Sequence, residues 1–200
     1  MVRDEQAGGP GLRERKLRET RQRITDAGIA LFIARGYDDT TVEQIAEAAG
    51  ISRRTFFGYF RSKDDVLLSL QSGMGDLLAA EVRQAPPSAR PLDAIRAAAM
   101  KVCAAVPPAD MIAIDRLMRS STAVQASKQA SYVRHEETLF AALRERWPAP
   151  ERAVGLRLVA MLAVGAMRLA TESFGNEGGE RTIGEVLDAS FDALAAETDA

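Results

Sequence analysis

The sequence has 200 residues, a formal net charge of −2 and 46% hydrophobic residues, enough for the packed core of one domain, or of a small module fused to a larger one. Its single cysteine, Cys103, excludes an internal disulfide and fits a reducing cytoplasm, and one cysteine with one histidine cannot form a Cys/His zinc site. Aromatic residues make up only 6% of the chain, which favours helices over sandwiches or barrels.

The N-terminal segment over 1–11 is rich in glycine and charge, and we expect a flexible arm without a signal peptide. A basic amphipathic helix follows over 12–34 and ends at Gly36. Residues 1–63 hold 12 basic and 9 acidic side chains, whereas the remainder holds 14 and 19. The basic excess indicates that nucleic acid contacts, if present, lie in the N-terminal part.

Two short helices are predicted next. Thr40 and Glu43 form a predicted capping box that opens a helix over 41–49. After a short break, Ser52 caps a second helix over 53–59. Two short helices joined by a tight turn that contains glycine are the layout of a helix-turn-helix.

The rest of the chain reads as longer helices. Ser62 followed by Asp65 caps a helix over 63–84. Further helices are predicted over 92–105, 110–120, 122–146, 151–174 and 182–197. No strand pattern is visible, so we expect an all-α fold of about nine helices.

The turn between the short helices and the buried face of the second helix indicate which side chains remain exposed to contact DNA. Gly50 can adopt the left-handed conformation of the turn, and Ile51 fills its corner. Phe56 and Phe60 form the buried face of the second helix. The residues left for base edges are Ser52, Arg53, Arg54 and Thr55. Arginine suits guanine and a threonine methyl suits thymine, but the sequence does not decide which arginine reads a base.

Phosphate contacts are expected from residues that flank this second helix or begin neighbouring helices. These candidates are Arg13, Arg15, Lys16, Thr40, Thr41, Tyr59 and Lys63. From periodicity alone, a packed three-helix cluster with solvated charges is an equally good interpretation.

Residues 15–70 resemble the DNA-binding region of the TetR family of transcriptional regulators. The segments that carry the resemblance are FxxxGYxxTTVxxIAxxAGIS, TFFxYF and SKDDVLL. The resemblance implies a nine-helix fold in which three helices bind DNA and the others bind a ligand and dimerise. It therefore implies a DNA-binding domain over 12–62 and a ligand-binding and dimerisation domain over 63–200. Phe57 stands where the family usually has a phosphate-contacting tyrosine, and Gly58 where a larger residue is common, so neither contact is carried over.

Methionine-dotted, alanine-rich helices follow, and methionine can line a pocket for apolar ligands, although core filling is its commoner role. The candidate ligand-binding residues are Met100, Cys103, Met111, Met118, Tyr132, His135 and Met161. The C-terminal region resembles an actinobacterial subgroup that includes mycofactocin-system regulators, which hints at an acyl or acyl-CoA-like effector. An anionic group of such a ligand could then meet Arg116, Arg119 or Arg134, although solvated faces are the commoner role of each.

The helices over 151–174 and 182–197 are expected to form a homodimer interface. The first is nearly apolar from Ala153 to Ala170 and needs burial on more than one side. Its longest uninterrupted apolar run, Leu158 to Met167, is shorter than the roughly 20 residues that span a bilayer, so no membrane partner is expected.

These features together predict a cytoplasmic DNA-binding repressor that a small ligand releases from a palindromic operator. No catalytic residue, metal ligand or cofactor is expected, because the chain lacks a recognisable nucleophile–base pair. The alternative is a helical small-molecule-binding protein or enzyme with a vestigial helix-turn-helix, against which the retained Arg53-Arg54 pair argues.

Overall fold

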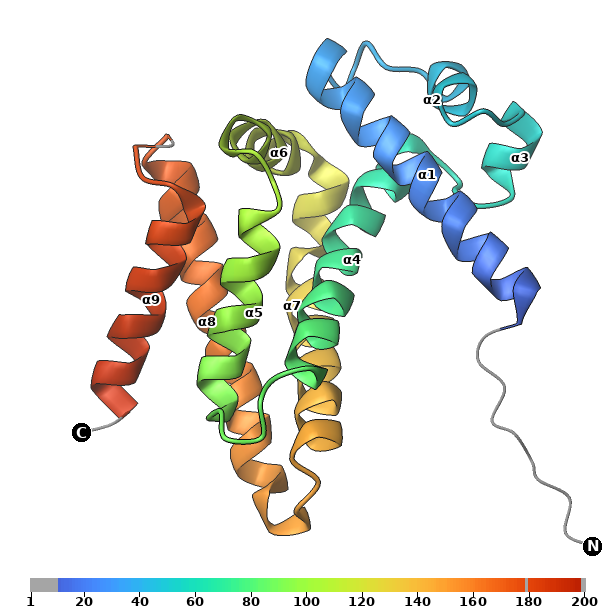
Figure 1. Ribbon diagram of the computed structural model, residues 1–200. Coiled ribbons are helices and arrows are strands. Elements are labelled where there is room, and N and C mark those ends of the chain that lie inside the picture. Colours follow the sequence, from blue (N-terminus) through green and yellow to red (C-terminus); the bar gives the residue numbers. More distant parts are fainter. Residues whose placement is uncertain (1–10, 179, 199–200) are drawn as a thin grey trace, which may run out of the picture. The chain divides into compact units, whose positions relative to one another are not determined.

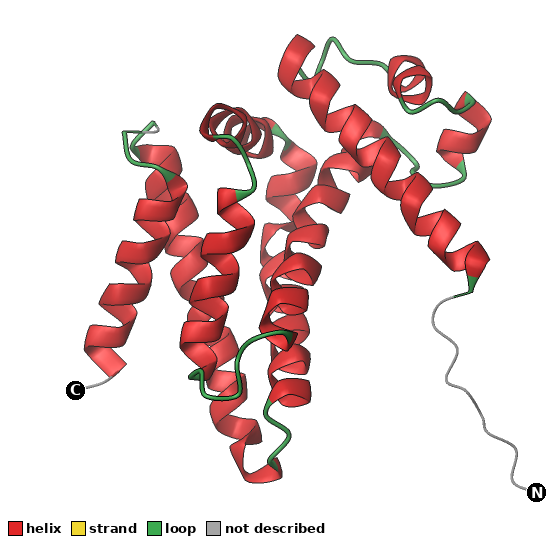
Figure 2. Ribbon diagram, viewed as in Figure 1, coloured by secondary structure: helices red, strands yellow, loops and turns green. Residues whose placement is uncertain are grey.

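The computed structural model describes residues 11–178 and 180–198, which form nine α-helices, one short 3-10 helix and no strand (Figures 1 and 2). The elements are α1 (Leu12–Arg35), α2 (Val42–Ala48), α3 (Arg53–Phe57), α4 (Lys63–Arg83), α5 (Pro91–Ala104), α6 (Pro108–Ser120), α7 (Thr122–Arg146), η1 (Pro150–Arg152), α8 (Ala153–Asn176) and α9 (Ile183–Thr198). The predicted all-helical fold is confirmed. The arm predicted over 1–11 lies, apart from Gly11, outside the described residues.

The chain divides into two compact units within α4, one ending at Leu67 and the other beginning at Leu68. The boundary predicted from the sequence, between residues 62 and 63, lies just before α4. The first turn of α4 belongs to the N-terminal unit, since Val66 and Leu67 are fully buried.

The N-terminal unit is built around aromatic and branched side chains from α1, α2, α3, the loop after α3 and the start of α4. Its buried residues include Ile24, Phe32, Ile45, Phe56, Phe60 and Val66. Gly28 on α1 allows close packing, since a Cβ there would lie only 2.9 Å from Cγ1 of Val66. The unit therefore holds α2 and α3 in one arrangement by core packing.

A polar cluster joins the loop after α1 to the start of α4. The Lys63 ammonium donates to the carbonyl oxygens of Tyr37 (2.6 Å), Asp38 (3.3 Å) and Thr40 (3.2 Å) and lies 4.2 Å from the centroid of the Tyr37 ring. The Tyr37 hydroxyl donates to the Asp64 carboxylate. Burial, and then this hydrogen bond, raise the pKa of Tyr37, so the hydroxyl keeps its proton.

Replacing Lys63 with methionine is expected to destabilise the N-terminal unit by roughly 1–3 kcal/mol, because it keeps the apolar stem and removes hydrogen bonds from a charged donor. Urea unfolding followed by circular dichroism measures the change. Lys16→Met, on the exposed part of α1, is the matched control. Equal midpoints for the two variants would contradict a structural role for the Lys63 ammonium.

The C-terminal unit is a helical bundle centred on α8, which packs against α5, α7 and α9. These helices run alongside one another in Figure 1, and α6 lies across one end of them. The axis of α6 turns by 101° from that of α5 at the Pro107-Pro108 break. The core of the bundle includes Leu139, Leu143, Ala160, Ala163 and Phe191, all essentially inaccessible to solvent.

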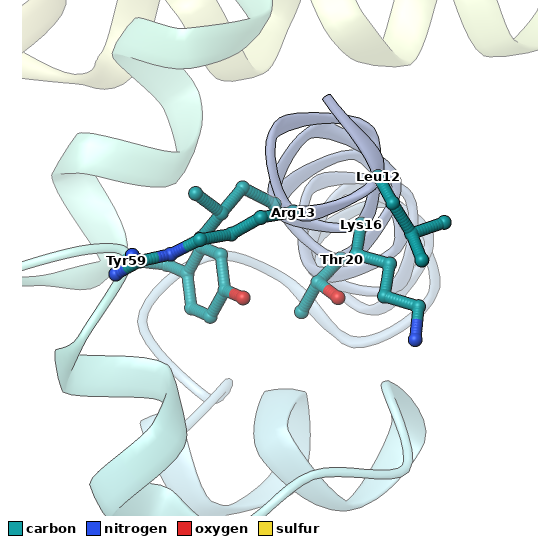
Figure 3. Close-up of a pocket in the computed structure, with 6 residues that line it drawn as sticks. Leu12, Arg13, Lys16, Thr20 and Tyr59 are labelled. Carbon is teal, nitrogen blue, oxygen red and sulfur yellow. The ribbon is translucent and has the colours of Figure 1, made fainter. Parts of the chain in front are cut away.

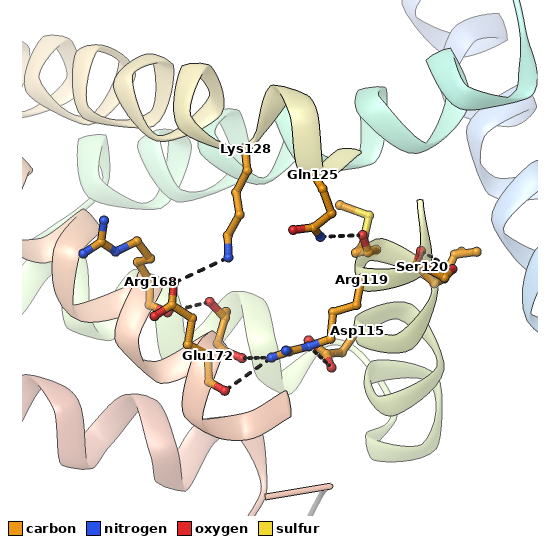
Figure 4. A network of polar contacts seen from close by, with 10 residues as sticks. Asp115, Arg119, Ser120, Gln125, Lys128, Arg168 and Glu172 are labelled. Atoms are coloured by element: carbon orange, nitrogen blue, oxygen red, sulfur yellow. Dashed lines mark hydrogen bonds and ion pairs between the residues drawn. The ribbon is translucent and has the colours of Figure 1, made fainter. Parts of the chain in front are cut away.

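Helix α6 has a single buried residue, Leu117, while Met111 and Ile112 are half-buried against the core, and polar contacts add to this packing. Arg119 donates to Asp115 on its own helix (2.9 Å) and to the carbonyl oxygens of Thr171 (3.1 Å) and Glu172 (3.3 Å) on α8 (Figure 4). Gly175 makes room for this contact, because a Cβ there would overlap the guanidinium. Arg119 thus fastens α6 to α8.

Helix α8 is unusually apolar for a bundle helix. Of the helices in the described ranges, only the continuous segment Pro150–Asn176 is by itself long and apolar enough to cross a bilayer. Its most apolar 18-residue stretch has a mean hydropathy of 1.7, and a third of that stretch is buried. A count of uninterrupted apolar residues does not identify this segment, because isolated charges such as Arg157 interrupt the run. The central helix of a bundle meets the same test. The exposed apolar remainder of α8 is therefore a surface that needs a partner.

Candidate nucleic-acid interface

The helix-turn-helix is formed by α2 and α3. The left-handed Gly50 (φ 65°) makes the turn, and its successor Ile51 is half-buried. Phe56 and Phe60 are fully buried beneath α3, as expected. The capping box that opens α2 uses Thr41 and Gln44, one residue later than predicted.

Helix α3 turns the predicted readers toward solvent. Ser52 caps the helix by accepting from the amide of Thr55 (3.0 Å), and the two hydroxyls lie 2.8 Å apart. Ser52, Arg53, Arg54 and Thr55 are all exposed. The buried aromatic face and the cap therefore fix the helix while its N-terminal residues remain free to enter a groove.

The structure distinguishes the two adjacent arginines. Arg53 forms an ion pair with Glu43 on α2 (2.9 Å), and its guanidinium lies 5.6 Å from the centroid of the Phe57 ring. No residue within the described ranges forms an ion pair or hydrogen bond with the Arg54 guanidinium. Arg54 is therefore the arginine whose donors are available to a guanine edge.

A basic groove lies beside the end of α3. Its lining residues are Leu12, Arg13, Lys16, Leu17, Thr20 and Tyr59, and Figure 3 shows two cationic and two hydroxyl side chains around the same open space. Arg21 supports it by donating to the Tyr59 carbonyl oxygen (3.1 Å) and stacking 4.3 Å from the centroid of Phe60. Cations with hydroxyl donors suit a DNA phosphate.

The groove includes only part of the predicted phosphate set. Arg13, Lys16 and Tyr59 line it, and Thr20 was missed because a lone threonine in a basic helix carries no pattern. Arg15 lies outside the groove and pairs with Glu19 (3.6 Å). Thr41 is exposed at the start of α2, where its hydroxyl serves the cap.

Two residues predicted to contact phosphate have side chains that are engaged within the N-terminal unit. The Thr40 side chain is 1% exposed, and its hydroxyl donates to the Gly36 carbonyl oxygen (2.7 Å). The Lys63 ammonium is occupied by the three carbonyl oxygens described above. Both side chains close the loop between α1 and α2 instead of facing outward.

The candidate ligand residues of the C-terminal unit separate into two groups. Met100, Cys103 and Met111 line one cavity. Met118, Tyr132, His135 and Met161 do not line it. The His135 ring packs against Gly75 of α4, where a Cβ would lie 2.7 Å from it. Met161 is 45% exposed on the outer face of α8. Arg119 is not a free anion-binding group, since it holds α8.

Such a fold and surface define a class: a helical protein with a helix-turn-helix unit joined to a larger helical bundle. Residues 24–70 match the family model described as bacterial regulatory proteins, tetR family, and residues 89–199 match that of the MftR C-terminal domain. The chain therefore belongs to the TetR family, with a C-terminal domain of the MftR type. The predicted resemblance to mycofactocin-system regulators is confirmed.

Individual relatives agree with this assignment. The HTH-type transcriptional regulator TcmR of Streptomyces glaucescens is 41% identical over 107 residues, which are 54% of this chain and 47% of TcmR. SrpR of Pseudomonas putida, also an HTH-type transcriptional regulator, is 47% identical over 49 residues, 24% of this chain and 23% of SrpR. The chain thus spans about half the length of TcmR and less of SrpR. Both relatives are regulators rather than enzymes.

Solved structures share the fold. The TetR-family repressor FadR of Thermus thermophilus, in complex with lauroyl-CoA, has a TM-score of 0.58 at 24% identity, over 87% of this chain and 92% of FadR. The SmeT–triclosan complex has a TM-score of 0.60 at 18% identity, over 90% of this chain and 91% of SmeT.

Proposed function

We propose that this protein is a cytoplasmic transcriptional repressor that binds a palindromic DNA operator as a homodimer and is released by a small ligand. The observation that carries the proposal is the exposed N-terminal face of α3, next to a groove lined by cations and hydroxyls. On that face, Arg54 has no ion-pair or hydrogen-bond partner within residues 11–178 and 180–198. Base reading and phosphate positioning are then available side by side.

The homodimer part rests on α8 and α9. Val154, Leu158, Met161, Leu162 and Leu169 lie along one side of α8 and are 45–74% exposed. Helix α9 packs on α8 and exposes Ala189, Ala193 and Ala196 at helical spacing. A second copy that covers both helices would complete a four-helix packing around a two-fold axis.

Regulation requires a ligand that binds the DNA-competent and DNA-incompetent states unequally. Helix α4 is the candidate for coupling, because its residues belong to both units. The dimer would place its two α3 helices in successive major grooves, about 34 Å apart. A ligand that favours another separation lowers the affinity for the operator.

Fluorescence anisotropy with the DNA upstream of the protein's own gene tests this function. We expect binding that weakens steeply with salt and that an unlabelled copy of the same DNA displaces far better than random DNA. Binding to every sequence alike, or no binding at low salt, would favour the alternative of a helical ligand-binding protein with a vestigial helix-turn-helix.

Lys16→Gln is expected to weaken binding to all DNA sequences alike and to reduce the slope of log K against log salt by about 1 per half-site, because one phosphate contact is lost. The matched control is Lys128→Gln, a charge-neutralising change on α7 of the C-terminal unit, outside the groove. A selective loss at the operator would instead show that Lys16 reads sequence.

A further inference from the structure

The C-terminal unit contains a cavity of about 290 Å³ where α5, α6, α8 and the start of α9 come together. All four helices contribute apolar side chains. These are Met100 and Cys103 from α5, Met111 and Ile112 from α6, Phe174 from α8 and Ile183 from α9. Flexible methionines on two walls can adapt to the outline of an apolar guest.

The polar groups at the rim of this cavity are already paired. Arg181 donates to both carboxylate oxygens of Glu177, and the Thr182 hydroxyl donates to Glu185 (2.9 Å). A charged ligand entering here would lose its hydration without gaining an unpaired partner of opposite charge, which is unfavourable. The lining therefore selects an uncharged guest.

The volume limits the guest further. If each atom takes about 30 Å³, as a water molecule does in the liquid, the cavity holds roughly ten non-hydrogen atoms. A short alkyl chain or a single substituted ring fits this volume, whereas a CoA thioester is several times too large. The volume of this cavity is similar to that of the smallest typical ligand pockets, about 300 Å³.

One wall of the cavity is the least buried helix of its bundle. Met111 and Ile112 belong to α6, which has a single buried residue and is fastened to α8 through Arg119 (Figure 4). Exposed polar contacts of this kind break at low cost compared with a packed apolar interface. Helix α6 can therefore move to admit a ligand while α5, α8 and α9 stay packed.

We propose that this cavity is the effector site of the repressor, and that its ligand is a compact, uncharged, mostly apolar molecule admitted by a displacement of α6. The regulatory role of the ligand rests on the proposed function, whereas binding of the ligand to the cavity does not depend on DNA.

Cys103 provides a reporter, because it lines the cavity and is the only cysteine of the sequence. Burial raises the pKa of its thiol, so labelling of the full chain with N-ethylmaleimide is followed by mass spectrometry at about pH 8.5, where more thiolate is present. The probes are 1-octanol and octanoate, which share a chain length and differ in charge.

At a 1-octanol concentration about ten times its Kd, labelling of Cys103 is expected to slow by about ten-fold, because only the empty fraction reacts. Octanoate at the same concentration is expected to change the rate less than two-fold. Equal protection by both probes would overturn the uncharged class of ligand. Protection by neither would overturn the site.

A filled cavity should abolish the effect. A Cβ at Gly184 would lie 3.5 Å from the terminal methyl of Met100, so Gly184→Leu directs a side chain into the space. Gly73→Leu on α4 is the matched control, because a Cβ there meets open space. We expect 1-octanol to protect the wild type and Gly73→Leu but not Gly184→Leu, and protection in Gly184→Leu would contradict the location.

Thermal melts by circular dichroism identify a variant that does not fold, and in that case the comparison of the two probes on the wild type still decides the proposal. Anisotropy on the same samples reports DNA binding separately. Specific DNA binding without protection of Cys103 rejects this effector site alone, whereas protection without specific DNA binding rejects the proposed repressor alone.

Discussion

Arg54→Ala is expected to weaken binding to the protein's own operator by roughly 1–3 kcal/mol per half-site, which is about 5–150-fold, while binding to unrelated DNA changes little. The reason is that the Arg54 guanidinium lies on the exposed face of α3 and has no ion-pair or hydrogen-bond partner among the described residues. Competition anisotropy with the operator and with random DNA of the same length measures both affinities and therefore the discrimination between them.

Arg53→Ala is the matched control, because Arg53 is the neighbouring arginine and is paired with Glu43. Its loss is expected to weaken specific and nonspecific binding by similar small factors. Glu43→Gln removes a negative charge that faces the same surface and is expected to strengthen binding to all sequences. If Arg53→Ala abolished discrimination while Arg54→Ala preserved it, the roles assigned to the two arginines would be reversed.

The preference for Arg54 shows where the sequence was sufficient and where it was not. Gly50, the buried Phe56 and Phe60, and the cap at Ser52 all follow from local rules, and they place the α3 surface correctly. The ion pair of Arg53 depends on the angle between α2 and α3, which no local pattern encodes. The two arginines were therefore indistinguishable before their surroundings were known.

The surroundings of Thr40 and Lys63 could not be read from the sequence for a similar reason. Thr40 with Glu43 and Thr41 with Gln44 both fit a capping box, and tertiary packing decides between them by burying Thr40 against the Gly36 carbonyl. Lys63 looked like a free cation near the recognition helix, but its long stem lets the ammonium reach the loop after α1. Side-chain contacts between residues that are distant in sequence cannot be predicted from periodicity.

The cavity of the C-terminal unit lay partly within reach of the sequence. Methionine content singled out Met100 and Met111, yet it equally favoured Met118 and Met161, which the fold places elsewhere. The convergence of α5, α6 and α9 arises from the sharp turn at Pro107-Pro108. Proline predicts the break there but not the direction in which the chain continues.

Leu162→Glu is expected to convert the protein to a monomer and to abolish operator binding. Leu162 is 45% exposed on the apolar side of α8, and a carboxylate there would be buried without a partner in the proposed dimer. The cost is at least about 3 kcal/mol, more than a hundredfold in the dimer dissociation constant. Analytical ultracentrifugation gives the oligomeric state, and anisotropy gives the affinity for the operator.

Val133→Glu is the matched control, because Val133 is an exposed apolar residue of α7 with the same exposure, 45%. Val133 is not part of the apolar side of α8, so its substitution is expected to leave both the dimer and operator binding intact. A folded monomer has one α3 helix and can bind only one half-site. It therefore loses the affinity that the two linked α3 helices of a dimer provide together. If Leu162→Glu remained dimeric and bound its operator normally, the dimer interface would not lie on α8. If it were a monomer that still bound the operator with full affinity, DNA recognition would not require a two-fold symmetric dimer.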